Sequence, residues 1–180
     1  TIAGWPGGKP NSDDTYRPER AKPEKKRVII FSPHPDDDVI SMGGTFQRLV
    51  DQGHDVHIVY QTSGNIAVSN DSVLKFLEVY SDIFDVNDSL INDVKKKLLN
   101  NNEIIEDKFI REVATKIREK EALAATRYVG LKDENVHFLR LPFYESGKIV
   151  KNKTSKNDSD LMNQIITKIK PHQIYAAGDL

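Results

Sequence analysis

Residues 28–38 read VIIFSPHPDDD, an apolar strand that runs directly into a histidine and three consecutive carboxylates. In an open α/β sheet, ligands bind where strands end and helices begin, at the carboxyl edge of the sheet. Imidazole and carboxylate groups are ordinary zinc ligands, and zinc acidifies the water bound to it. This stretch therefore predicts a metal site at the end of a buried strand in an α/β fold.

The three acids also have a structural interpretation. An aspartate before a helix is commonly an N-cap, and acids in the first helical turn complement the helix dipole. Asp37 and Asp38 alone would need no further role. Three adjacent acids, however, repel one another unless a cation or a raised pKa relieves them, and such clusters are typical of functional sites. We therefore favour the functional interpretation.

Two other chemistries fit the spacing poorly. A phosphoacceptor of the haloacid dehalogenase type needs the pattern D-x-D-x-T/V, whereas Ile40 stands two residues after Asp38. A phosphate-binding loop needs glycines before its helix. Here Gly43 and Gly44 come after the last acid. The spacing therefore indicates neither phosphotransfer to an aspartate nor nucleotide binding by a glycine-rich turn.

Short β-rich runs alternate with helical stretches along the rest of the chain. Hydrophobic periodicity separates the two classes. The expected strands are residues 28–32, 55–62, 136–139 and 173–177; the expected helices are residues 40–52, 107–129 and 160–169, with a polar, helical stretch at 71–113 and a polar loop at 152–158. Because strands that alternate with helices form a parallel sheet, the sequence predicts an α/β fold.

Composition narrows the classes of partner. The chain has 180 residues, a net charge of −1 and no cysteine. The absence of cysteine excludes disulfides and thiolate metal sites, and the balanced charge provides no basic field for nucleic acid or anionic membranes. The sequence contains neither an apolar run long enough to cross a bilayer nor a signal peptide. We expect a cytoplasmic protein with a small-molecule substrate.

The beginning of the chain differs from the rest in composition. Residues 1–26 are rich in proline, glycine and charge. Such a segment cannot bury a core and is typical of a linker. We therefore expect a covalently attached upstream domain, then this linker, then one domain over residues 27–180 with a helical insertion at about residues 71–113.

These residues resemble the PIG-L/LmbE-like family of zinc-dependent N-acetylglucosaminyl deacetylases. The family signature, P/A-H-P-D-D-E before a Gly-Gly helix, is matched by PHPDDD at residues 33–38 and GGT at residues 43–45. Further segments agree in order: TSG at residues 62–64, the R-x-x-E pair of Arg118 and Glu121, HFLRLP at residues 137–142 and KPHQIY at residues 170–175. Within the family, the chain looks closest to the LmbE-like C-terminal region of bacterial glucosamine-6-phosphate deaminase-like proteins.

The resemblance implies a fold and a set of roles. The fold is a Rossmann-like three-layer αβα arrangement with a mostly parallel sheet. His34 and Asp37 become ligands of a zinc ion, and Asp36 becomes the general base that accepts a proton from the metal-bound water. The family's third ligand is a histidine in an H-x-x-H segment, which we expect beyond residue 180. The domain would then be incomplete at its C-terminus and inactive as this fragment alone.

Candidate substrate contacts lie near the ends of the strands. The resemblance also places Asp38 where the family usually has Glu. We expect substrate to contact Asp38, Thr62, Ser63, Asn65 and Arg140. A guanidinium can hold a sugar hydroxyl or a phosphate through two hydrogen bonds, although an ordinary surface position is about as plausible for Arg140. Arg118 and Glu121 are interpreted as an ion pair that anchors a helix to the sheet, outside the site.

The function implied by the resemblance is metal-assisted removal of an N-acetyl group from an amino sugar, of the N-acetylglucosamine type or its 6-phosphate. The alternative is a non-catalytic sugar-binding or regulatory module fused to a glucosamine-6-phosphate deaminase-like enzyme. His34, Asp36 and Asp37 favour the enzyme. A parent protein without an H-x-x-H segment would favour the module. The oligomeric state is left open.

Overall fold

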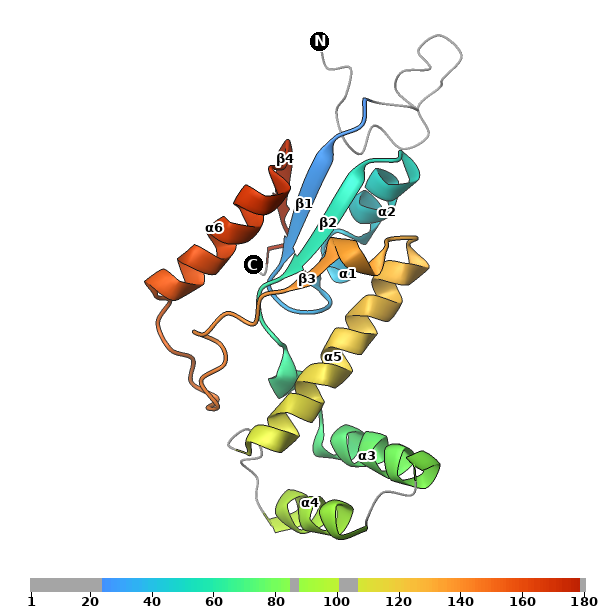
Figure 1. Cartoon of the computed structure of the whole chain (residues 1–180), viewed down its shortest axis with the longest axis vertical. Coiled ribbons are helices and arrows are strands. Elements are labelled where there is room, and N and C mark those ends of the chain that lie inside the picture. The colour runs from blue at the N-terminus through green and yellow to red at the C-terminus, as the bar shows by residue number, and fades with distance from the viewer. Residues whose placement is uncertain (1–23, 85–87, 101–106, 179–180) are drawn as a thin grey trace.

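A computed structural model describes residues 24–84, 88–100 and 107–178. Its centre is a four-stranded sheet in the order β3-β2-β1-β4 (Figure 1). All the strand pairs are parallel. The strands are β1 (Arg27–Ser32), β2 (Asp55–Tyr60), β3 (Val136–Phe138) and β4 (Gln173–Ala176). The predicted α/β fold with a parallel sheet is confirmed.

Helices cover both faces of this sheet (Figure 1). The α-helices of the described residues are α1 (Asp37–Ile40), α2 (Gly43–Asp51), α3 (Asn70–Phe84), α4 (Asp88–Asn100), α5 (Lys108–Tyr128) and α6 (Lys156–Ile169). One core contains side chains of β1, β2, α2 and α5, whereas a second core contains side chains of β1, β2 and α6. The sheet is thus the middle layer of an αβα arrangement.

Strand β1 contributes to both cores. Val28 and Ile30 pack on the face that α2 covers, and Ile29 and Phe31 pack on the face that α6 covers. A strand buried on both faces has no polar side to present. This is why the sequence of β1 is a continuous apolar run. Because the strand is anchored on both faces, the position of the loop that follows β1 is also fixed.

Helices α3 and α4 lie in the stretch predicted as a helical insertion and share a separate core with α5. Helices α3 and α4 pack together and against the first half of α5, and Figure 1 shows them at the end of the molecule farthest from β4. The shared core consists of Val73, Leu77, Ile91, Val94, Leu98, Ile110, Ala114 and Ile117. Residues 85–87 and 101–106 of the predicted helical stretch and residues 1–23 of the predicted linker lie outside the described residues.

Two predicted helices have different bounds in the structure. The expected helix over residues 40–52 is divided into α1 and α2, because α1 ends at Ile40 and α2 begins only at Gly43. Helix α6 begins at Lys156 rather than Asp160, because Asp158 accepts a hydrogen bond from the Ser155 amide at 2.7 Å and forms a capping box. The last three residues of the predicted loop, 156–158, therefore form the first turn of the helix, whereas residues 152–155 lie outside it. Within the described residues, none of the helices combines the length and apolar character needed to cross a bilayer.

Two histidines form a stacked pair on the sheet. The rings of His57 on β2 and His137 on β3 have centroids 5.3 Å apart, and Nδ1 of His57 lies 3.1 Å from Nε2 of His137. Burial lowers the pKa of both imidazoles, and the pKa of His137 falls to about 4. Lys168 also lowers both pKa values, whereas Asp55 opposes the shift at His57. The folded protein therefore holds this pair neutral at pH 7.

The pair predicts acid sensitivity of the fold. An unfolded histidine takes up a proton near pH 6.5, so a lowered folded pKa gives stability that is present above pH 6.5 and is lost as the pH falls toward 4. Between pH 6.5 and pH 4, we expect the free energy of unfolding of wild type to fall by about 1–2 kcal/mol more than that of His137→Gln, after allowance for solvent screening. Urea unfolding at several pH values measures this, with His172→Gln as the control. Equal pH dependence in wild type and His137→Gln would contradict the assignment.

Candidate functional site

The first loop of the site joins β1 to α1. The His34 amide donates a hydrogen bond to Oδ2 of Asp37 at 2.8 Å, and Nδ1 of the His34 ring lies 3.2 Å from the same oxygen. Bonds of about 2.0–2.2 Å to a tetrahedral zinc place neighbouring ligand atoms about 3.3–3.6 Å apart. The two side chains predicted as metal ligands thus contact each other at hydrogen-bond distance, slightly closer than two ligands of one zinc ion.

These two side chains do not make a complete zinc site. Catalytic zinc normally has three protein ligands. In the part of the chain that the structure describes, His, Asp and Glu residues nowhere gather in a group of three or more that could hold a metal. The third ligand that the family resemblance implies was predicted beyond residue 180 and lies outside the described residues.

Asp36, the predicted general base, is held by helix α5. Its Oδ2 accepts a hydrogen bond from Nη2 of Arg118 at 2.8 Å, and Nη1 of Arg118 binds Glu121 at 2.9 Å. The Asp36 side chain remains 42% exposed, whereas that of Arg118 is only 16% exposed. The pair with Glu121 exists as predicted, and Arg118, which we had placed outside the candidate site, also contacts Asp36. Sequence spacing shows the contact within the helix and not the one between the helix and a distant loop.

Asp38 lies beneath the first loop. It is fully buried, at 0% exposure, and accepts hydrogen bonds from the Tyr60 hydroxyl at 3.0 Å and the Ser32 hydroxyl at 3.3 Å. Burial raises the pKa of Asp38, and the hydrogen bond from Tyr60 partly opposes that rise. The carboxyl group thus joins α1 to the ends of β1 and β2. The structure does not support the substrate contact predicted for Asp38, because substrate cannot reach a side chain enclosed by the protein.

The second loop, which follows β2, packs tightly on the first. The Thr62 hydroxyl donates to the Pro33 carbonyl at 2.7 Å. Gly64 has a φ of +62°, and a Cβ there would lie 2.8 Å from Cδ of Pro35. Glycine is therefore required both by the left-handed backbone and by the close approach to Pro35. This contact fixes the position of the His34 loop from its side.

The predicted substrate contacts on the second loop are largely engaged within the chain. Thr62, Ser63 and Asn65 are 4%, 1% and 7% exposed. Asn65 donates to Thr115 at 3.3 Å and to Glu145 at 3.4 Å. Substrate contacts of Thr62 and Asn65 thus have no support in the geometry. Among the described residues, the buried Ser63 hydroxyl has no hydrogen-bond partner.

The third loop, which follows β3, brings Tyr144 rather than Arg140 to the site. Arg140 Nε binds Glu119 at 2.7 Å and its Nη1 binds Glu112 at 3.0 Å, so its guanidinium is engaged by α5. The phosphate or sugar contact predicted for Arg140 is therefore not supported. Tyr144 packs edge-on against the His34 ring, with centroids 5.8 Å apart.

A lysine extends this third loop. Lys151 Nζ lies 3.6 Å from the centre of the Tyr144 ring, and partial burial lowers the pKa of Lys151. Cations bind the faces of aromatic rings in this way. Because Tyr144 also packs against His34, the Lys151 ammonium group lies near the candidate site. The spacing of residues in the sequence did not predict this contact.

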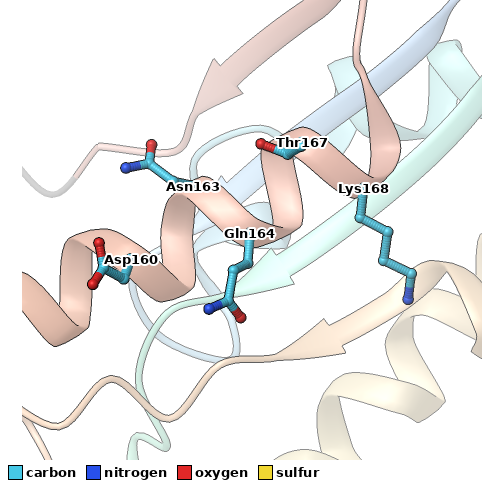
Figure 2. A pocket seen from close by; sticks show the side chains of 5 residues that line it. All are labelled: Asp160, Asn163, Gln164, Thr167 and Lys168. Carbon is cyan, nitrogen blue, oxygen red and sulfur yellow. The ribbon is translucent and has the colours of Figure 1, made fainter.

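A hollow on the surface lies along α6 and not at these loops (Figure 2). Its lining side chains all come from that one helix: Asp160, Asn163, Gln164, Thr167 and Lys168. None of them belongs to the three loops around His34. We place the candidate site at the loops, because the ligand-type and acid–base groups gather there.

The contact between the two loops can be tested at Gly64. Gly64→Ala should destabilise the fold by about 1–3 kcal/mol, because it combines a strained backbone with a clash against Pro35. Gly53→Ala is a matched control, since Gly53 has a φ of +75° but open space around its Cβ position. Thermal unfolding of both variants measures the difference. If Gly53→Ala proved as costly as Gly64→Ala, the close packing on Pro35 would have no energetic weight.

The sequence of this chain is similar to a known protein family and to proteins of two organisms. The family described as GlcNAc-PI de-N-acetylase (PIG-L) matches residues 29–180. A putative glucosamine-6-phosphate deaminase-like protein of Bacteroides thetaiotaomicron is 51% identical over all of this chain, and the chain spans only 28% of that relative's length. A diacetylchitobiose deacetylase of Thermococcus kodakarensis is 40% identical over 48 residues, which cover 27% of this chain and 18% of the relative. With its family signature, its parallel sheet and a family match over most of its length, this chain belongs to the PIG-L family, whose members are generally deacetylases.

Proposed function

We propose that this chain supplies the metal-binding and acid–base part of a zinc-dependent enzyme that removes the N-acetyl group from an N-acetylglucosamine-type sugar. One observation carries the proposal. His34 and Asp37 present ligand atoms 3.2 Å apart, and the partly exposed Asp36 lies between them in the sequence, held by Arg118. Ligands and base therefore emerge from one short, fixed loop.

Zinc fits the donor set of the first loop. An imidazole nitrogen and a carboxylate oxygen are both usual zinc ligands, and the chain contains no cysteine that would select a softer metal. Bound zinc would polarise the acetamide carbonyl and lower the pKa of a water molecule toward neutrality. His34 and Asp37 would hold the ion, with a histidine from outside the described residues as the third ligand.

Asp36 would carry the proton during amide hydrolysis. Arg118 occupies its Oδ2, and the exposure of the side chain leaves the carboxylate accessible to water. Asp36 accepts a proton from the attacking water while the water oxygen bonds to the acetamide carbon, and the carbon–nitrogen bond of the acetamide then breaks. The same proton passes to the departing nitrogen, so that acetate and the free amine are released. Arg118 is a positioning residue, because it fixes the orientation of Asp36 without touching the reacting atoms.

The third loop supports a polar, sugar-like substrate. Tyr144 provides an apolar ring edge beside His34, and Lys151 provides a cation on the face of that ring. Tyr144 is only 8% exposed, so we assign it to positioning the His34 ring, whereas a lysine ammonium can bind a phosphate substituent of a sugar. We therefore transfer the proposed phosphate contact from Arg140 to Lys151. The relative from Thermococcus kodakarensis, named a diacetylchitobiose deacetylase, is consistent with an N-acetylated sugar.

The length of the relative supports a larger assembly. Because this chain corresponds to 28% of the Bacteroides thetaiotaomicron protein, we propose that it functions next to a covalently linked upstream domain. The name of that relative further suggests that the neighbouring domain handles a phosphorylated amino sugar. An amino sugar released by deacetylation would then be a chemically suitable substrate for it.

The proposal can be tested by acetate release from the intact protein with bound zinc. Asp36→Asn should retain zinc but lose about 10²–10⁴ in rate, because an amide cannot accept the proton. Glu121→Gln is the matched control, since Glu121 also binds Arg118 but lies outside the loop. Near-normal turnover by Asp36→Asn would exclude Asp36 as the base.

The substrates in this experiment should include N-acetylglucosamine and its 6-phosphate. Lys151→Gln should raise the KM for the phosphate more than the KM for the neutral sugar, whereas Arg140→Gln should not discriminate between them. Stoichiometric zinc and saturable sugar binding without acetate release from any N-acetylated sugar would instead identify a sugar-binding module.

A further inference from the structure

The outer face of α3 carries a row of large apolar side chains that the rest of the described chain leaves uncovered. We refer to Phe76, Val79, Tyr80, Ile83 and Phe84 as the α3 stripe; they are 53%, 52%, 53%, 67% and 62% exposed. Their spacing of three and four residues places them along one side of a helix. Val73 and Leu77 on the adjacent side of α3 already fill the core shared with α4 and α5. Helix α3 is therefore apolar well beyond what its own core requires.

The size and place of the α3 stripe suit an interface. A large aromatic side chain has about 150–250 Å² of surface, so these exposed fractions amount to roughly 500 Å². That is near the upper limit for an apolar patch on a monomer. Figure 1 shows α3 at the end of the molecule, away from the sheet and from α1, the helix that follows the first loop. Another protein could reach the stripe there without covering the candidate site.

Charges beside the stripe indicate which partner it fits. Lys75 and Asp82 are both exposed and lie seven residues apart, so they occupy the same flank of α3. Glu78, the acid between them, is engaged by Lys95 of α4 at 2.7 Å. When two copies of a helix pack antiparallel about a twofold axis, equal flanks face each other in reversed order. Lys75 of each copy would then face Asp82 of the other.

We propose that α3 forms the interface of a homodimer, in which two α3 stripes pack antiparallel about a twofold axis near the middle of the helix. One Lys75–Asp82 ion pair forms at each end of this interface, so a second copy of the chain covers the apolar row and pairs its charged flank at the same time. Such a pair buries on the order of 1,000 Å², the lower limit for a specific interface. We therefore expect a dissociation constant in the micromolar range. This inference does not depend on the proposed function.

Charge reversal gives a direct test by sedimentation equilibrium of the intact protein. Lys75→Glu places acid against acid at both ends, and Asp82→Lys places base against base, so each variant should dimerise several-fold more weakly than wild type. An equimolar mixture of the two variants should restore dimerisation, because a mixed dimer has complementary pairs at both ends. This rescue also shows that neither variant is misfolded. Failure of the mixture to dimerise better than either variant alone would overturn the antiparallel arrangement.

The apolar part of the interface is tested by Ile83→Glu, which should weaken dimerisation by more than tenfold. Tyr128→Glu is the control, since Tyr128 is 94% exposed at the far end of α5 and should change nothing. A wild-type protein that remains monomeric well above micromolar concentration would refute the proposal. So would a dimer that tolerates Ile83→Glu, or a monomer that uses the stripe to bind lipid vesicles.

Discussion

Burial of β1 between two helical layers is the constraint on which the rest of this structure depends. Residues 28–31 face α2 on one side of the sheet and α6 on the other, and all four are 5% exposed or less. At about 1.5–3 kcal/mol for each buried aliphatic or aromatic side chain, this strand contributes a substantial part of the hydrophobic free energy of folding. A one-residue shift of β1 would exchange its two faces and move every loop residue that follows. The position of His34 is therefore set by packing and not by the loop alone.

Around the loop that follows β1, the buried polar side chains stabilise the fold, whereas the exposed ones are available to bind ligands. Asp38 and Thr62 are enclosed and bind β1, β2 and the first loop to one another. Asp36 and His34 remain accessible, and Arg118 and Tyr144 restrict their orientation. The shorter side chain of Asp38, where the family usually has Glu, reaches the hydroxyl groups of Ser32 and Tyr60 beneath the loop. Of the three consecutive acids, Asp38 therefore stabilises the loop, whereas Asp36 and Asp37 are the proposed base and metal ligand.

The sequence was sufficient to predict the parallel sheet, and it led us to propose a site at the loop after β1. Continuous apolar runs identified β1 and β2, and strand–helix alternation gave the parallel arrangement. The first loop was predicted from its residue types, because a histidine and three acids at a strand end have few structural explanations. Ion pairs between residues far apart in the sequence could not be predicted from residue types or spacing. Arg118 lies 82 residues from Asp36 and Arg140 lies 21 residues from Glu119, and only the packing of α5 against the loops determines these contacts.

Zinc binding by the intact protein tests the central claim most directly, because it measures the proposed ligands without requiring turnover. Calorimetric titration should show one zinc ion per chain, bound at least about 100-fold more weakly after His34→Ala or Asp37→Ala, since loss of a direct ligand should cost at least as much as loss of an outer contact. His57→Gln should leave the affinity unchanged, because His57 pairs with His137 away from the loop. Equally tight zinc binding after both His34 and Asp37 are replaced would show that the metal is held elsewhere and would contradict this account.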